Sequence, residues 1–585
     1  MVACSSGKFI LSSHRCLLNN TLGPYFKVRP GGTLAPVIIT TDKTQLTQFS
    51  GNKSAYPVYL TIGNIPKDTR CQPSAHACVL IAYLSVDKID RTQMSDQEHH
   101  SRVQRVFHDS MRIILEPLIN AGKEGVEMVS SDGSVRDVFP ILSSYVADYP
   151  EQCLVACTKY GTCIKCRAKA TELEDMSADP TTNNVSPYPA RTQIWTSSII
   201  DEGKANAGGN AKAFHSYCMS HDVAGSIFKP FWEGFPLCDI HKAMTPDVLH
   251  QLYQGIFKHL VNWCQSALGA AKLDQHIRCL PPGYGLQHFK NGISALSQIS
   301  GPERKNMAKI LLSCLVGSMP ANWIKAVTAL LDFIYIVQYT AHDNTTFGYL
   351  CDTLQRFHQH RCYFLDCKIQ KDFNIPKFHS LLHYIKSIEL FGTTDNYNME
   401  MFEQLHIDFA KHGWRATNQC NEFPQMIRWL SCQEKVASFA VFQKSLSPKD
   451  PPIPLSQKPP ISIAKTPNFP NQSIAVIKDA HRAPHFDHYL KVYLNSFADN
   501  PYPLRSQALE DAPCPITKID VFNMFCFHPT AIHDDEEEKD TVKAIPCSSK
   551  IPDGRFDTVI AITGDDAEST GLAGTSIRNH LQNYF

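Results

Sequence analysis

Over roughly the first 150 residues, apolar runs alternate with short polar breaks. Three runs follow one another closely, at residues 35–42, 56–65 and 77–85. We expect three β-strands there, because Val, Ile, Tyr and Thr favour strands. Residues 97–121 instead carry apolar side chains three and four positions apart, which predicts an amphipathic helix. A fourth strand is expected over residues 138–148, just before a Tyr-Pro pair.

Two carboxylates stand where predicted strands end: Asp42 closes the first strand and Asp148 closes the fourth. Each could be an unrelated aspartate that starts a turn. However, the order strand, strand, strand, helix, strand is that of the ribonuclease H-like fold, in which the first and fourth strands are neighbours. The two carboxylates would then lie together and could bind Mg²⁺ or Mn²⁺ through hard oxygen ligands. Two such ions, about 3.5–4 Å apart, suit phosphoryl displacement.

A cluster of cysteines follows the fourth strand directly. It consists of Cys153, Cys157, Cys163 and Cys166. The last pair is a C-x₂-C preceded closely by a glycine, which is typical of a zinc knuckle, and four thiolates could close a structural tetrahedral site. Cys153 also fits an apolar core, so Cys218 and His221 are alternative partners for Cys163 and Cys166. The remaining interpretation is a metal-free loop of reduced thiols.

Helical spacing dominates the middle of the chain. Asp247 and His250 stand three positions apart on a predicted helix that Pro246 begins, so they could orient each other by a hydrogen bond. The plainer alternative is a capping aspartate and a half-buried histidine. His379 and His383 are four apart on another helix. No third ligand is near them in the sequence, so we expect a structural or phosphate-contacting role.

A further helix is predicted over residues 398–418, where Glu400, Glu403 and His406 recur every three positions and share a face. Such a helix could bring a third carboxylate to the two strand-end aspartates, although a solvent-exposed glutamate face is the more common arrangement. Lys411 and Arg415 at its end suit the helix dipole and could also contact phosphate.

Composition adds bounds to this pattern. The chain has 585 residues, with 43% hydrophobic and 19% charged residues, which predicts several globular domains. Its formal net charge is zero, which neither supports nor excludes binding to nucleic acid. We expect no secretory signal, so the 21 cysteines should be reduced thiols or metal ligands. The most apolar region, residues 309–339, is interrupted by polar residues and a proline, so we expect two buried helices and no membrane partner.

The patterns divide the chain into six segments. They are an N-terminal extension (1–30), the first part of the core with the cysteine knuckle (31–168), a mainly helical insertion (169–395), a core-completing helical segment with the catalytic glutamate (396–444), a Pro-rich linker (445–480) and a small β-rich C-terminal domain (481–585). In the last segment we expect strands at 488–494, 519–528 and 556–562, and a solvated acidic loop at 534–540.

Several long segments resemble the Plavaka-type transposases of basidiomycete fungi, which are related to CACTA elements and similar to KDZ transposases. They include VADYPEQCLVACTKYGTCIKC (146–166), CDIHKAMTPDVLHQLYQGIFKH (238–259), PKFHSLLHY (376–384), EQLHIDFAKHGWRATN (403–418) and RFDTVIAITGDDAESTGL (555–572). The resemblance runs from about residue 25 to the C-terminus. It implies a DDE DNA transposase of mixed α/β class, with a ribonuclease H-like catalytic core interrupted by a large, mainly helical insertion.

Carried over by motif, the resemblance implies three catalytic acids. Asp42 would be the first and Asp148, at the end of a strand, the second. Asp247, which begins a helix, is the alternative second acid. Glu403 would be the third acid, with Glu400 as the alternative.

Other residues match the family more loosely. Asp247 and His250 match the D-x₂-H motif that follows the second acid in related families. The expected contacts to DNA are Lys43, Lys411, Arg415 and His379. The acids would hold two Mg²⁺ (or Mn²⁺) ions, one activating water or a DNA 3′-hydroxyl and the other stabilising the leaving oxygen. A structural Zn²⁺, DNA from transposon ends and target sites, a homo-oligomer and a nuclear location complete the expectation.

The sequence also departs from the family. Relatives usually carry zinc-finger-like sequence before the first strand, so an N-terminally truncated copy is expected here, and Ile164 replaces a proline in the knuckle. A catalytically inactive relic that binds DNA or protein is the alternative function. A structural metalloprotein with no nucleic-acid role is the third.

Overall fold

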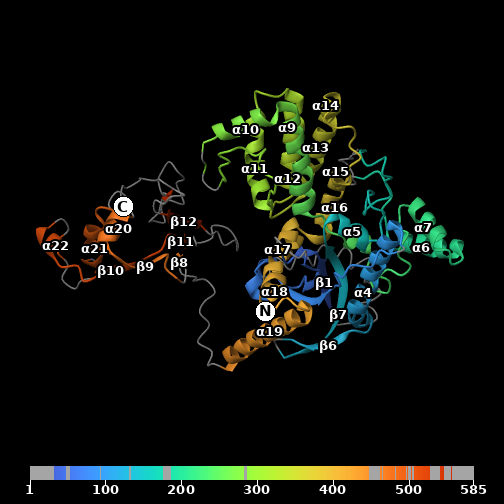
Figure 1. The fold of residues 1–585 in the computed structure, drawn as a ribbon, viewed down its shortest axis with the longest axis horizontal. Helices are drawn as coiled ribbons and strands as arrows, with labels where there is room; N and C mark the ends of the chain where they lie inside the picture. Colours follow the sequence, from blue (N-terminus) through green and yellow to red (C-terminus); the bar gives the residue numbers. More distant parts are fainter. Residues whose placement is uncertain are drawn as a thin grey trace. The chain divides into compact units, whose positions relative to one another are not determined.

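The computed structural model in Figure 1 describes most of the first 446 residues and parts of the rest. The described residues are 32–47, 53–92, 94–130, 133–175, 186–281, 283, 286–446, 461–463, 466–480, 483–495, 497, 502–503, 506–527, 540–545 and 555–556. The chain divides into two compact units, residues 1–437 and residues 438–585. The predicted N-terminal extension, residues 534–539 of the acidic loop, and residues 447–460 and 464–465 of the Pro-rich linker lie outside the described residues.

A five-stranded mixed sheet forms the centre of the first unit. Its strands, in spatial order, are β5 (Val79–Tyr83), β4 (Pro57–Ile62), β1 (Thr33–Thr41), β7 (Val135–Val146) and β6 (Val126–Val129). β1 runs antiparallel to β4 and parallel to β7. The prediction that the first and fourth strands are neighbours is therefore confirmed, and their carboxyl ends meet at one edge of the sheet.

The alternation of side chains along β1 assigns each face of the sheet to a different helix. Val37 and Ile39 pack with Phe107 and Met111 of α4 (Asp96–Glu124), the predicted amphipathic helix, whose N-terminus Ser95 caps. Ile38 instead packs with Phe402 of α17 (Met399–Leu405) on the other face. Since side chains alternate with a period of two, Asp42 falls on the α17 side.

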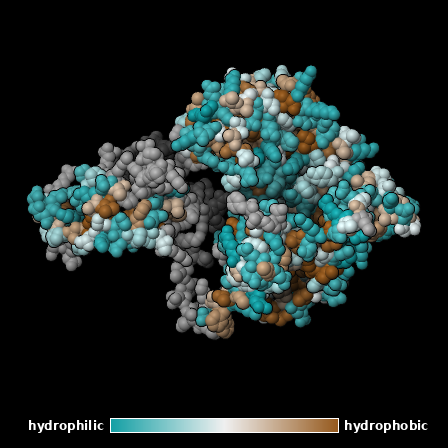
Figure 2. Space-filling view, in the orientation of Figure 1, coloured by the Kyte–Doolittle hydropathy of each residue, from teal (hydrophilic) through white to brown (hydrophobic). Residues whose placement is uncertain are grey.

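Two short features of this region were not predicted. Thr44–Gln45 and Ser54–Ala55 pair as the small strands β2 and β3, and β6 forms a hairpin with β7. All four β6 residues are exposed, so no buried alternation marks them in the sequence. Figure 2 shows hydrophobic residues gathered in the lower part of the sheet-bearing region, in the area of β6, β7 and α4 in Figure 1.

The middle of the chain is mainly helical, as predicted, and its larger part stacks above the sheet in Figure 1. It contains α9 (Lys258–Leu268), α10 (Ala270–Cys279), α11 (Gly301–Leu315), α12 (Ala321–Ile336), α13 (Asn344–His360) and α14 (Cys362–Asp366), with α6 (Gln193–Ala207) and α7 (Ala211–Ser220) to one side. The apolar region 309–339 is covered by α11 and α12, which share one buried cluster. Among the described residues, no helix is both long and apolar enough to cross a membrane.

Two π-helical segments adjoin the sheet edge. They are η3 (Val248–Phe257), which follows the short α8 (Ile240–Ala243), and η6 (His406–His412), which continues α17 and leads into α18 (Gly413–Arg415) and α19 (Glu422–Leu446). Between them in sequence come α15 (Pro376–His379), the 3₁₀ turn η4 (Ser380–His383), α16 (Tyr384–Phe391) and a second 3₁₀ turn, η5 (Thr394–Tyr397). π-helical turns are frequent at functional sites, so both segments indicate a functional site at this edge of the sheet.

The second unit holds two small antiparallel sheets. One pairs β9 (Phe469–Ser473) with β10 (Lys518–Val521), and the other has the order β13 (Arg555–Phe556), β12 (Asp540–Ile545), β11 (Met524–Phe527), β8 (Ile461–Ile463). Its helices are α20 (Ile474–Ala480), α21 (Phe486–Asn495) and α22 (Gln507–Asp511). The strand predicted at 488–494 is wrong, because its apolar residues pack at helical spacing within α21. The strand predicted at 519–528 is split into β10 and β11, and most of 556–562 lies outside the described residues.

Candidate active site and metal centre

Asp42 and Asp148 meet at the carboxyl edge of the sheet. Thr40 pairs with Val146 across β1 and β7, and each aspartate stands two residues further along its strand. Asp148 caps α5 (Tyr149–Val155), and its Oδ1 accepts a hydrogen bond from the Glu151 N–H at 3.0 Å. Burial raises the pKa of Asp148, and the negative charges of Asp42 and Asp247 raise it further. Such mutual repulsion is typical of carboxylates that share a site for a cation.

The third carboxylate is that of Glu403, on the helix that follows the long insertion in the sequence. Glu403 of α17 has its Oε1 at 3.3 Å from Nε2 of His250. His250 Nδ1 lies 2.7 Å from Oδ2 of Asp247, which is fully buried and caps η3. Burial alone would lower the pKa of His250, but the hydrogen bond and the charge of Asp247, together with Glu403, raise it to about 9. The imidazolium thus bridges two carboxylates.

A second histidine holds Asp42 in place. His406 Nε2 lies 3.0 Å from Oδ2 of Asp42, and its Nδ1 lies 3.0 Å from the Tyr59 hydroxyl. His406 is buried and follows Glu403 by one helical turn, so one helix supplies both the third acid and the group that orients the first. The three-residue spacing predicted that His406 shares a helical face with Glu403, but no pattern in the sequence indicated its partner. Tyr59 carried no signal at all.

The structure separates the alternative acids. Glu400 forms an ion pair with Lys305 at 2.7 Å and accepts from the side chain of Asn398, the cap of its helix. It is thus engaged away from the other acids, whereas Glu403 faces them. We call Asp42, Asp148, Asp247, Glu403 and His250 the acid site.

The four residues predicted to contact DNA lie in different surroundings. Lys43 and Arg415 are exposed, and Lys411 is partly exposed on η6; these three stay predictions. His379 is fully buried, so the prediction that it contacts DNA is corrected. Its partner is the Cys166 thiol at 3.1 Å.

Glu151 is a further acid beside the site that the sequence analysis did not single out. Its Oε1 accepts hydrogen bonds from Thr41 Oγ1, at 2.5 Å, and from the Tyr56 hydroxyl. Burial raises the pKa of Glu151 from 4.5 to about 7, and the charges of Asp148 and Asp42 contribute to the rise. Glu151 therefore links α5 to the end of β1 and to the residue that precedes β4, close to the first two acids.

Replacing Glu151 with Gln is expected to stabilise the metal-free chain at alkaline pH. Because the folded carboxyl has a pKa above its unfolded value, the folded chain binds more protons between pH 4.5 and 7, and stability falls as the pH rises through this window. Gln keeps an acceptor for Thr41 without the charge. The melting temperature in EDTA should therefore rise at pH 8, by about 2 °C, and should not rise at pH 4.

The matched control for this change is Glu116→Gln, which removes an exposed carboxylate from α4. It should leave the pH profile of the melting temperature unaltered. A Glu151→Gln variant that melts lower than the unmodified chain at pH 8 would show that the ionised carboxylate stabilises this corner.

A second cluster, here called the Cys/His centre, joins the knuckle to α15 and η4. It consists of Cys163, Cys166, His379 and His383, whose ligand atoms all lie within 4.8 Å of one another. Cys163 Sγ is 3.2 Å from His383 Nε2, and Cys166 Sγ is 3.1 Å from His379 Nε2. Two sulfur and two nitrogen donors at such spacing suit one tetrahedral ion, with Zn²⁺ the usual occupant.

The surroundings of the Cys/His centre favour the thiolate of Cys163 and a ligating tautomer of His379, whereas a hydrogen bond to Cys163 and burial raise the pKa of the Cys166 thiol. Burial would raise the pKa of the Cys163 thiol, but hydrogen bonds from Cys166 and from the backbone N–H of Lys165 leave it lowered. His379 Nδ1 lies 3.1 Å from the Leu173 carbonyl, so the Nδ1–H donates and Nε2 is left for a metal. The centre therefore has the donors and the outer hydrogen bond of a metal site.

This centre corrects the predicted zinc ligands. Cys163 and Cys166 are retained, but Cys153 and Cys157 are replaced by the two histidines. Cys153 contacts Tyr149 in the core, and Cys157 Sγ lies 3.8 Å from His108 Nε2. The alternative partner Cys218 belongs to the core between α6 and α7, and His221 bonds the Tyr217 carbonyl. The histidine pair was visible in the sequence, but its partners are more than two hundred residues away.

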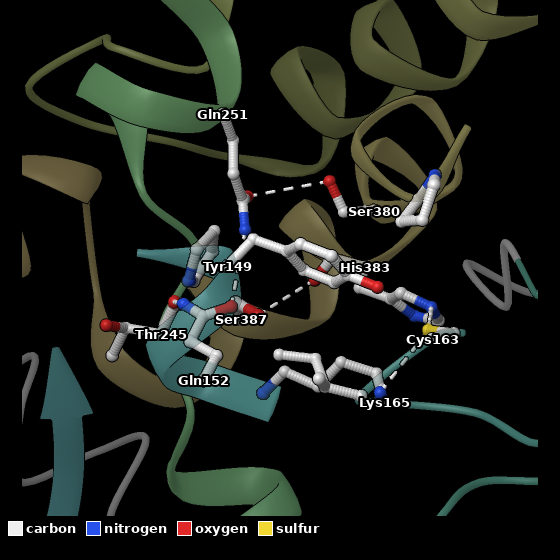
Figure 3. A pocket seen from close by; sticks show the side chains of 12 residues that line it. Tyr149, Gln152, Cys163, Lys165, Thr245, Gln251, Ser380, His383 and Ser387 are labelled. Carbon is white, nitrogen blue, oxygen red and sulfur yellow. Dashed lines mark hydrogen bonds between the residues drawn. The ribbon is translucent and has the colours of Figure 1, made fainter. Parts of the chain in front are cut away.

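A small pocket and a polar network connect the two centres (Figure 3). Gln152 donates to the carbonyls of Ala147 and Thr245, which stand shortly before Asp148 and Asp247 in the chain. Gln251 accepts from the Tyr384 hydroxyl at 3.2 Å, and Ser380 is oriented towards it. The elements that carry the acids are thus bonded to the segment that carries the two histidines of the Cys/His centre.

Part of this chain is similar to a known protein family. Residues 23–264 match the model of a family described as Plavaka transposase. The matched range contains Asp42, Asp148, Asp247, His250 and both cysteines of the centre. A search of curated proteins found no match. Residues 23–264 of this chain are thus similar to the Plavaka transposase family.

Proposed function

We propose that the chain is a DDE transposase that cuts and joins DNA strands at a ribonuclease H-like core. The observation that carries the proposal is the convergence of Asp42, Asp148 and Glu403, which stand far apart in the sequence. The parallel pairing of β1 with β7, flanked by β4 and β5, supports the fold assignment. The family supplies the substrate class, since transposases act on DNA.

The acid site fits divalent cations. Its carboxylates are hard oxygen donors, and burial together with the neighbouring acids raises the pKa values of Asp148 and Glu403, so the site gathers negative charges close together. Asp42, Asp148 and Glu403 would hold Mg²⁺ or Mn²⁺. When bound, such ions activate the attacking oxygen and neutralise the charge on the leaving oxygen of a phosphodiester.

The protein's own residues place these ligands. His406, which is itself bonded to the Tyr59 hydroxyl, fixes the carboxylate of Asp42, and the α5 N-terminus fixes that of Asp148. His250 balances the charges of Asp247 and Glu403. We assign Asp247 to orienting His250, because its two oxygens are occupied by His250 and by the Leu249 N–H. We further propose a structural Zn²⁺ in the Cys/His centre and a nuclear location, where the DNA substrate lies.

The proposal is tested in two steps with the purified full chain. First, binding to a labelled DNA duplex is measured; then Mg²⁺ is added and strand cleavage of supercoiled DNA is followed. Binding together with Mg²⁺-dependent cleavage is the expected result. Binding without cleavage would favour an inactive relic, and absence of binding would favour a metalloprotein with no nucleic-acid role.

A further inference from the structure

Lys377 lies beside the acid site but was not among the residues predicted to bind DNA. It belongs to α15, two residues before the metal-ligating His379. Its ammonium donates to the His250 carbonyl at 2.9 Å. Because the His250 ring is bonded to Asp247 and Glu403, this contact places the Lys377 ammonium beside the acid site. The Cys/His centre therefore fixes a cation next to the carboxylates.

A glycine in η3, Gly255, leaves room for the Lys377 side chain. A Cβ at Gly255 would lie 2.6 Å from Cδ of Lys377 and 3.3 Å from its Nζ. Any residue other than glycine would thus meet the lysine stem, and the same Cβ would lie 2.9 Å from the His250 carbonyl. The absence of a side chain at this buried π-helical position leaves room for Lys377 to reach the site.

The hydrogen-bonding of Lys377 is incomplete. Within the described part of the chain, no carboxylate oxygen lies within 4.0 Å of its ammonium, and the His250 carbonyl is its one hydrogen-bond acceptor. An ammonium carries three donors, and a partly buried one without an anionic partner is costly. Two donors are therefore left for a ligand, and the adjacent carboxylates are the place to which a phosphodiester must come.

A second cation extends the same edge. Lys258 follows η3 and is exposed, and its charge acts on Lys377. The His259 ring contacts Phe378. Burial lowers the pKa of His259, and the charges of Lys377 and Lys258 lower it further. The acid site is thus bordered by two cations, Lys377 and Lys258.

We propose that Lys377 is a phosphate-binding residue of the DNA site, and that with Lys258 it holds the DNA backbone next to the acids. This inference rests on the proposed function and adds to it the surface along which the DNA backbone lies. The ligand is the sugar–phosphate backbone and not a base. An ammonium held in one position by its aliphatic stem recognises the negative charge of a phosphate and does not distinguish base sequence.

Lys377→Met tests the proposal. Binding of the full chain to a fluorescent duplex of arbitrary sequence is measured over a range of salt concentrations, with Ca²⁺ in place of Mg²⁺ so that the DNA is not cut. Loss of one phosphate contact should lower the slope of log affinity against log salt by about 0.9 and weaken binding about tenfold at low salt. Lys377→Arg keeps the charge and should keep the slope.

The matched control is Lys272→Met, which removes an exposed lysine from α10. It should bind like the unmodified chain. If Lys377 only pins α15 to η3, Lys377→Met will lower the melting temperature and leave the salt slope unchanged, which overturns the proposal. An equal loss of slope in the Lys272 variant also overturns it. Failure of the unmodified chain to bind DNA would overturn the proposed function as well, so the two failures are distinguishable.

Discussion

Replacing Asp42 with Asn should reduce Mg²⁺-dependent DNA cleavage by about a thousandfold or more. The change removes one negative charge from the acid site and almost no volume. The Asn side-chain oxygen can still accept a hydrogen bond from His406, so the contact between the end of β1 and η6 is retained. Cleavage of supercoiled DNA by equal amounts of both proteins, over a series of Mg²⁺ concentrations, measures the effect.

The control for charge is Asp201→Asn. Asp201 is on α6, its side chain is 71% exposed, and it pairs with Lys204 one turn away. This variant should cleave at the unmodified rate. Cleavage by the Asp42 variant at an unchanged rate, with a normal melting temperature, would remove Asp42 from the catalytic machinery. Equal losses in both variants would point to a general effect of net charge.

The part of the site that could be predicted from the sequence is the part that local patterns determine. The end of β1 and the end of β7 are marked by β-branched runs, and their order along the chain is sufficient to make Asp42 and Asp148 neighbours. Glu403 followed from its position on a helical face and from the family resemblance. These inferences needed only strand order, helical periodicity and the parallel pairing of two strands.

The remaining features depend on tertiary packing. The histidines of the Cys/His centre are 213 and 220 residues away from their cysteine partners, and no periodicity relates segments so far apart. Cys153 is closer to the knuckle in sequence, but its side chain packs in the hydrophobic core. Likewise, Glu151 could be recognised as part of the site only from the structure, in which the Tyr56 hydroxyl donates to it.

The second large effect is expected from the Cys/His centre. Replacing His379 with Ala should release the bound metal and lower the free energy of unfolding of the first unit by about 3 kcal/mol or more. His379 is fully buried and joins the knuckle to α15, so its loss leaves Cys166 and the Leu173 carbonyl without their partner. Metal content by mass spectrometry and melting temperature, with and without a chelator, measure both effects.

Cys153→Ser is the control that separates the two ligand sets. Both substitutions alter a buried side chain that lies near the knuckle, so some loss of stability is common to them. Only the His379 variant should lose the metal, because Cys153 contacts Tyr149 and not the ligand group. Retention of the metal by the His379 variant together with its loss from the Cys153 variant would restore the four-cysteine site. Since α15 also carries Lys377, release of the metal should in addition weaken DNA binding, whereas the Cys153 variant should bind DNA normally.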